Sequence, residues 1–121
     1  MILAEMPVLS QEELDDLNEA CCRFAGIDAV NYKSGKPAYW PPVSTDQYWA
    51  ITLMEALKKT FMRIKILVGW DYIVGVSEAY AGAPLYCGAD PDSLPLALAR
   101  ATKLLAENAV LNKQVKKGRR P

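Results

Sequence analysis

The chain has 121 residues, 51% of them hydrophobic, with 14 basic side chains, 14 acidic side chains and no histidine. This length predicts one domain with a packed core, and no apolar run approaches the ~20 residues that a bilayer crossing needs. The lack of histidine removes Ser-His and Cys-His nucleophiles and every imidazole metal site. A carboxylate or a lysine with a shifted pKa could still act, so the composition makes catalysis less favoured without excluding it. Our expectation is a protein that is not an enzyme and holds no metal or cofactor.

Charge and cysteine content narrow the class of partner. Four basic side chains, Lys116, Lys117, Arg119 and Arg120, lie within residues 116–121. The body, residues 1–115, is expected to form the single domain and is mildly acidic, which argues against binding of duplex nucleic acid. We interpret residues 116–121 as a basic, solvated tail. Three cysteines without a C-x-x-C spacing, and no secretory signal, favour a reducing cytoplasm.

The first helix is predicted over residues 11–25. Ser10 and Glu13 have capping-box spacing, apolar residues then recur at helical intervals, and Gly26 can end the helix in the left-handed conformation. A long connector rich in turn-forming residues follows, over residues 26–43.

The second helix is predicted to end near Lys59. Pro41 and Pro42 stop any preceding element, and Ser44 with Gln47 again has capping-box spacing. Two neighbouring apolar stripes run along this helix, which predicts that both sides of it are covered. The stripes are Tyr48, Ile51, Met54 and Leu57, and beside them Trp49, Leu53 and Ala56.

The period then changes from helical to alternating. On one face of residues 62–68 lie Met62, Ile64, Ile66 and Val68, with Arg63 and Lys65 on the other. Gly69-Trp70-Asp71 permits a tight reversal, and Tyr72, Val74 and Val76 alternate again. This pattern predicts an antiparallel hairpin, with Ala83–Cys87 as a third strand kept at an edge by Pro84. A last helix is predicted from about 94 to 112 or slightly beyond, with Gly118 ending any continuation. The fold class is therefore α+β, a small antiparallel sheet of two to three strands layered with three helices.

Two segments resemble a known family, the phage ABA-sandwich domain. The first is Trp40-Pro41-Pro42-Val43-Ser44-Thr45-Asp46 followed by Trp49, which is similar to the opening signature of that family. The second is Leu96-Ala97-Leu98-Ala99-Arg100-Ala101, which resembles its C-terminal helix and follows the acidic turn Ala89-Asp90-Pro91-Asp92. In element order the resemblance covers roughly residues 10 to 110.

This resemblance implies a function. The domain is linked to the first type of Thoeris anti-defence protein, which is not an enzyme but sequesters a cyclic ADP-ribose signal made by a bacterial TIR-domain protein. Some of these proteins also hold cyclic oligonucleotides of the CBASS system, at a separate site on hexameric assemblies. The resemblance thus implies a cyclic nucleotide sponge, a dimer or hexamer, acting in the cytoplasm of an infected bacterial host.

Arg100 is the first candidate ligand contact. It is the only charged residue between Asp92 and Lys103, and the small alanines around it leave space for a phosphate or a ribose. The alternative is an arginine that reaches past the helix edge to pair with an acid.

Six further residues are weaker candidates, each with a structural alternative. Trp40 can stack a base or cover the core, and the Tyr80 and Tyr86 rings can face a ligand or a neighbouring subunit. Arg63 belongs to the polar strand face, where solvation is the simplest interpretation. Ser44 and Thr45 are helix caps first and ligand contacts second.

Two other functional classes stay open. A small hydrolase would need a carboxylate with a shifted pKa, such as Asp46 or Glu78. A structural or interaction protein of a phage or prophage would bind no small molecule and would present a large apolar interface, built on the two stripes of the second helix.

Overall fold

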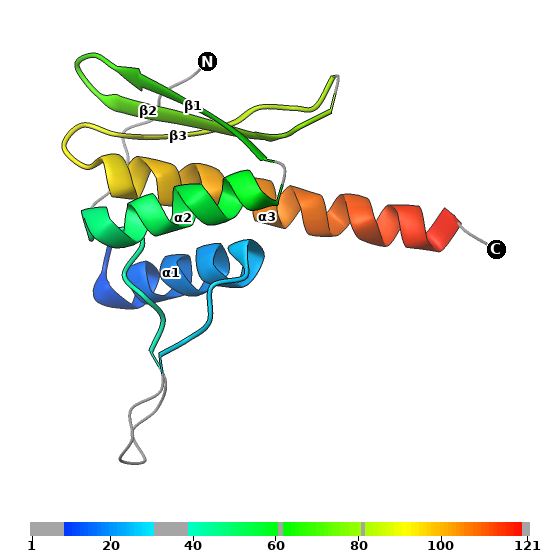
Figure 1. Ribbon diagram of the computed structural model, residues 1–121, viewed down its shortest axis with the longest axis horizontal. Coiled ribbons are helices and arrows are strands. Elements are labelled where there is room, and N and C mark those ends of the chain that lie inside the picture. The colour runs from blue at the N-terminus through cyan, green and yellow to red at the C-terminus, as the bar shows by residue number, and fades with distance from the viewer. Residues whose placement is uncertain (1–8, 31–38, 61, 81, 120–121) are drawn as a thin grey trace.

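The computed structural model describes residues 9–30, 39–60, 62–80 and 82–119, with side chains described up to residue 108. Two helices come first, then three strands, then a long helix (Figure 1). The elements are α1 (Gln11–Ala25), α2 (Gln47–Lys59), β1 (Met62–Val68), β2 (Tyr72–Glu78), β3 (Tyr86–Asp90) and α3 (Leu94–Arg119).

The three strands form one antiparallel sheet in the order β1-β2-β3. Ile64 pairs with Val76 across the first hairpin, which turns at 69–71 as predicted, and Val74 pairs with Gly88 on β3. The third strand exists and lies at an edge, but the predicted bounds Ala83–Cys87 were wrong. Pairing begins only at Tyr86, because Pro84 has no N–H to give to a ladder.

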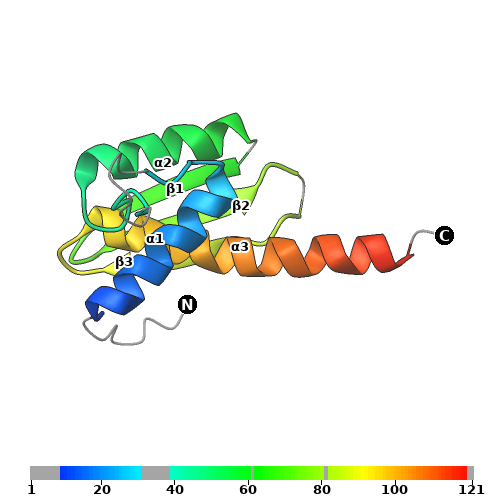
Figure 2. The same cartoon turned by 90° about the horizontal axis from the view of Figure 1, so that it is seen from below.

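The helices form two layers on one side of the sheet. The α2 and α3 helices lie against one face of the sheet, and α1 packs against the far side of both (Figure 1). Seen from below, α1 crosses under α3 (Figure 2). The expected α+β class, a small antiparallel sheet layered with three helices, is confirmed.

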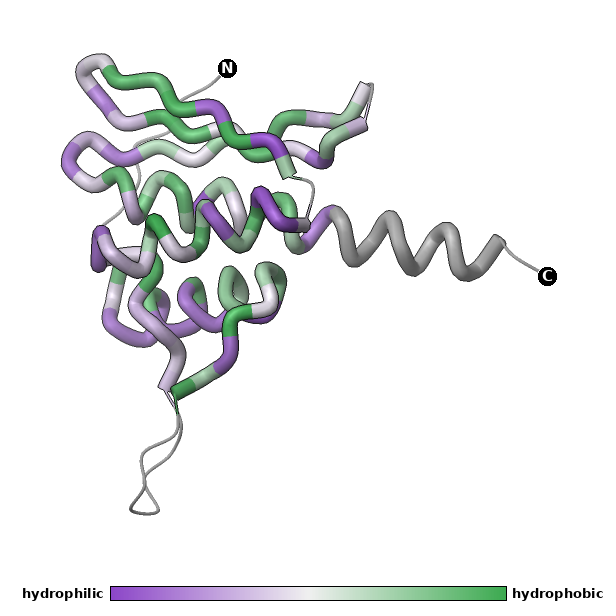
Figure 3. The backbone as a smooth tube through the Cα atoms, in the orientation of Figure 1, coloured by the Kyte–Doolittle hydropathy of each residue, from purple (hydrophilic) through white to green (hydrophobic). Residues whose placement is uncertain are grey.

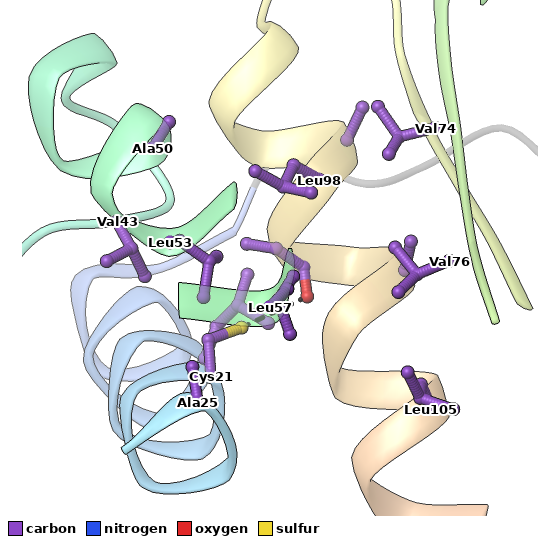
Figure 4. Packing of buried hydrophobic residues seen from close by; sticks show 14 of the residues in the cluster. Cys21, Ala25, Val43, Ala50, Leu53, Leu57, Val74, Val76, Leu98 and Leu105 are labelled. Atoms are coloured by element: carbon purple, nitrogen blue, oxygen red, sulfur yellow. Dashed lines mark hydrogen bonds between the residues drawn. The ribbon is translucent and has the colours of Figure 1, made fainter. Parts of the chain in front are cut away.

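The core lies between these layers. Val74 and Val76 point from β2 toward α3, while Leu53 comes from α2 and Cys21 from α1 (Figure 4). All four side chains are fully buried. Burial of each aliphatic side chain of this size contributes about 1.5–3 kcal/mol, so this cluster holds the layers together.

The ends of the first two helices show which caps act. Ser10 and Glu13 form the predicted capping box, and Gly26 takes φ 78° as the expected left-handed stop. The capping box predicted for Ser44 and Gln47 was wrong. Asp46 is the N-cap of α2, and its carboxylate accepts a hydrogen bond of 3.2 Å from the amide of Trp49.

Two further expectations about the helices were wrong. The α3 helix ends at Arg119 rather than near 112, so the backbone of residues 116–119, which we interpreted as a tail, continues this helix. Among the described residues, only one side of α2 is covered. Ala50, Leu53 and Leu57 are buried, whereas Tyr48 and Ile51 are 72% and 47% exposed.

The connector between α1 and α2 is described only at its ends. Val30 and Tyr39 form an antiparallel bridge with N···O distances of 2.8 and 3.0 Å, and residues 31–38 lie outside the described part of the chain. Among the described residues, none of the helices combines the length and apolar character that a membrane crossing requires.

Candidate functional site

Arg100 lies where the first turns of α3 pass the outer edge of β3. Its Nη1 donates to the carbonyl oxygen of Ala89 at 2.7 Å and to Oδ1 of Asp90 at 3.2 Å. The Arg100 and Asp90 side chains are only 10% and 14% exposed, so this ion pair is largely shielded from water. The pairing of Arg100 with an acid, which we weighed against ligand contact, is therefore present.

The turn after β3 fixes Asp90 in place. Its second carboxylate oxygen, Oδ2, accepts hydrogen bonds from the amides of Asp92 and Ser93 at 3.0 and 2.8 Å. Ser93 in turn accepts from the amide of Leu96 through Oγ, which satisfies a donor in the first turn of α3. The carboxylate of Asp90 is thus held by the turn on one side and by Arg100 on the other.

A second polar contact joins α1 to the segment that leads into α2. Ser44 is fully buried, and both its amide and its hydroxyl donate to Oδ1 of Asn18, at 3.0 and 2.7 Å. Thr45 follows and is exposed. Ser44 therefore positions the α2 entry against α1 and does not cap the helix.

These two polar contacts border one cavity, which we call the Arg100 cavity. Its volume is about 450 Å³ and it lies between the start of α1, the entry to α2 and the start of α3. It is lined by Leu9, Leu14, Ser44, Thr45, Asp90, Pro91, Asp92, Ser93, Leu96 and Arg100. Three of the seven predicted site residues, Ser44, Thr45 and Arg100, thus meet at one place.

Two smaller cavities share walls with the Arg100 cavity. One of about 370 Å³ includes Leu9 and Arg100 and extends toward Cys87 and Lys103. The other, of about 400 Å³, includes Leu14 and Thr45 and contains Trp40. Three adjoining cavities therefore surround the start of α1 on the described surface.

The charge of the Arg100 cavity is mixed. Arg100 brings one positive charge, while Asp90 and Asp92 bring two carboxylates. The cavity therefore offers more hydrogen-bond acceptors than cationic donors. Hydroxyl and amino groups of a ligand suit these walls better than several phosphates do.

Trp40 lines the neighbouring cavity of about 400 Å³ and not the Arg100 cavity. It is half-buried against the core, and the guanidinium carbon of Arg23 lies 4.9 Å from the centre of its ring. A cation at this distance from an indole face is a favourable contact. One face of the Trp40 ring is therefore occupied by Arg23, and the residue also covers the core edge, as the structural alternative predicted.

The other three predicted residues lie elsewhere. Tyr86 is half-buried against the core, and Tyr80 is 48% exposed beyond the end of β2. Partial burial raises the pKa of Tyr80, and the nearby carboxylate of Glu78 adds to this effect. Arg63 is exposed on β1, far from α3 in the sheet order. None of these three residues lines the Arg100 cavity.

The site also contains residues that the sequence did not single out. Asp90 and Asp92 were recognised only as turn formers, although the spacing of Asp90 to Arg100 placed both at the β3–α3 junction. Asn18 carried no signal, because one amide side chain within an amphipathic helix has no distinctive pattern. The hydrolase candidates Asp46 and Glu78 do not line the Arg100 cavity.

A comparison of the chain with known protein families, curated proteins and solved structures finds no match.

Proposed function

We propose that this protein binds a cyclic nucleotide immune signal, a cyclic ADP-ribose isomer or a cyclic oligonucleotide, and holds it without cleaving it. In this proposal it is a phage anti-defence protein that acts in the cytoplasm of an infected bacterium. The resemblance of Trp40–Asp46 and Leu96–Ala101 to the phage ABA-sandwich domain supplies the ligand class.

The observation that carries the proposal is the meeting of the two motifs. Ser44 and Thr45 from the first motif and Arg100 from the second line the same cavity. Its volume of about 450 Å³ falls within the ~300–1,000 Å³ typical of small-molecule sites. Leu9, Leu14 and Leu96 supply apolar walls, and the polar groups come from the segment before α2, the turn after β3 and the first turns of α3.

The wall chemistry indicates how such a ligand would lie. Ribose hydroxyls and the adenine amino group are donors, and they match the carboxylates of Asp90 and Asp92. A phosphate would have to share Arg100 with Asp90, which already lies 3.2 Å from it. We therefore orient a nucleoside part toward Asp92 and place at most one phosphate beside Arg100.

The test is recovery of the ligand. The purified protein is incubated with cyclic ADP-ribose isomers and cyclic oligonucleotides, washed and denatured by heat, and the released compounds are identified by mass spectrometry. Intact ligand at a fixed ratio to protein is the expected result. Recovery of cleavage products would replace the proposal with a hydrolase, and retention of no compound would reject both.

Two variants then test whether the ligand is bound in the Arg100 cavity. Thr45 is exposed, so Thr45→Trp should fill the cavity without disturbing the core and should abolish retention. Lys59→Ala, which removes an exposed charge at the far end of α2, is the control and should bind as wild type does. Equal retention by Thr45→Trp and Lys59→Ala would place the ligand elsewhere.

A second candidate function is supported by one observation. Tyr48 and Ile51 on α2 are exposed although they belong to an apolar stripe. A structural or interaction protein of a phage or prophage, without a small-molecule ligand, would use such a surface. In that case no compound would be retained, while the assembly described next would still form.

A further inference from the structure

Exposed apolar side chains concentrate along one margin of the molecule. On α2 they are Tyr48 and Ile51, and on the first hairpin they are Ile66, Leu67, Val68 and Trp70. We call these six residues the β1–α2 strip. Val68 is 73% exposed and Trp70 is fully exposed. Long apolar stretches of the hairpin are visible in green in Figure 3.

The β1–α2 strip borders an unpaired strand edge. Within the described residues, β1 pairs along one side only, with β2, over its full length of Met62–Val68. The N–H and C=O groups that face away from β2 are open to another strand. Exposed edges are usually shielded by charge, proline or a covering element, because they template pairing with other chains. Here the second half of the edge carries Ile66, Leu67 and Val68 instead.

We propose that this edge pairs with β1 of a second copy of the chain, antiparallel and about a two-fold axis, to give a continuous six-stranded sheet. The paired edge is β1, whereas the Arg100 cavity lies beside β3, at the other edge of the sheet, and the start of α3. The proposal therefore does not depend on the proposed ligand.

The side-chain pattern of β1 selects the register. With Ile66 opposite its own copy, Ile64 lies opposite Val68, and Lys65 lies opposite Leu67. Apolar side chains then meet on the helix-facing side, and no two like charges are opposed. Centring the pair on Lys65 instead would oppose two lysines, which is destabilising. Centring it on Leu67 would pair only residues 66–68 of the strand, against residues 64–68 for Ile66.

The position of α2 supports the same axis. After α2 the chain reverses and β1 runs back along the helix (Figure 1). Ile66 lies four strand residues from the start of β1, about 13 Å, and Ile51 lies eight helical residues before Lys59, about 12 Å. Ile51 and Ile66 are thus nearly level. A two-fold axis through Ile66 brings Ile51 close to its own copy, so that one contact covers both halves of the β1–α2 strip.

Oligomeric state is the first test. Wild type should sediment as a dimer, or as a larger even-numbered assembly built from this dimer. Ile66→Lys and Val68→Lys should give monomers at concentrations at which wild type associates. Leu85→Lys changes a leucine that is 51% exposed and lies outside the strip, so it should associate as wild type does. Circular dichroism checks that each variant is folded.

Cross-linking tests the register. In a Cys87→Ser background, where Cys21 and Cys22 are buried, Ile66→Cys should form a disulfide-linked dimer under mild oxidation. Lys65→Cys in the same background should cross-link much less, because its partner position is Leu67. A wild type that stays monomeric, or a dimer that survives Ile66→Lys and Val68→Lys as it survives Leu85→Lys, would overturn the proposal.

Discussion

Gly88 on β3 lies so close to Ala97 on α3 that a Cβ at position 88 would overlap the Ala97 carbonyl oxygen. The same Cβ would lie 2.5 Å from the amide nitrogen of Ala101. Ala97 and Ala101 are fully buried. The alanine-rich segment that resembles the family signature therefore has a packing role, because small residues on both elements allow α3 to approach the sheet closely.

Gly88→Ala should consequently destabilise the fold. The new methyl group would meet backbone atoms, which cannot rotate away, so helix and strand must separate. Overpacking in a core typically costs 1–3 kcal/mol, and we expect a loss of about 3 kcal/mol or more here. Gly69→Ala is the control, since no atom lies within 4 Å of the added Cβ. Urea denaturation of both variants checks this, and similar midpoints would contradict the close contact.

Local patterns in the sequence predicted the elements well. The bounds of α1 and β1 follow from a capping box, a C-terminal glycine and strict alternation, each of which acts within a few residues. The third strand was misplaced because Ala83–Cys87 has little alternation, and its start depends on pairing with β2. The exposure of Tyr48 and Ile51 was missed because periodicity shows that a face is apolar, not what covers it.

The site was predictable only in part. Arg100 stood out as a lone charge among alanines, and Ser44 and Thr45 stood out after two prolines. Their convergence depends on how α1, α2 and α3 pack, which no local spacing encodes. The bond from Ser44 to Asn18 spans 26 positions and had no signal in the sequence.

The Asn18–Ser44 contact makes a second prediction. Asn18→Ala leaves the amide and the hydroxyl of Ser44 buried without their acceptor, which should cost about 2–3 kcal/mol. Ser44→Ala removes the hydroxyl but keeps the backbone bond to Asn18, so it should cost less, about 1 kcal/mol. Chemical denaturation measures both values, and a larger loss for Ser44→Ala would contradict this assignment.

The Arg100–Asp90 pair makes a third prediction, about stability alone. Arg100→Met keeps much of the aliphatic stem but leaves Asp90 without its cation and Ala89 without its donor. We expect a loss of about 1–3 kcal/mol in the free energy of unfolding. A double-mutant cycle with Asp90→Asn should show that the two losses are not additive, since each change removes the same contact. Strict additivity would mean that the pair contributes nothing.

The adjacent thiols of α1 make the last prediction, a dependence of stability on pH. Burial raises the pKa of Cys22 from 9.0 to about 11. The pKa of Cys21 is also raised, by burial and then by the neighbouring Cys22. Both side chains are fully buried, and Sγ of Cys21 donates to the carbonyl oxygen of Ala99 on α3 at 3.2 Å, a bond that requires the protonated thiol.

The direction of the effect follows from proton linkage. Between about pH 9 and 11 the unfolded chain has lost the Cys22 proton while the folded chain retains it. The folded state then binds more protons, so its stability falls as pH rises, by up to about 1.4 kcal/mol per pH unit for each thiol. The stability that depends on the protonated, buried Cys22 thiol is fully present below pH 9 and is progressively lost as the pH rises toward 11.

Cys22→Ala should therefore be less stable than wild type at pH 7, because it leaves a cavity, but should lose stability less steeply from pH 9 to 10.5. Urea denaturation across this range measures both slopes, and parallel curves would show that Cys22 does not titrate with unfolding.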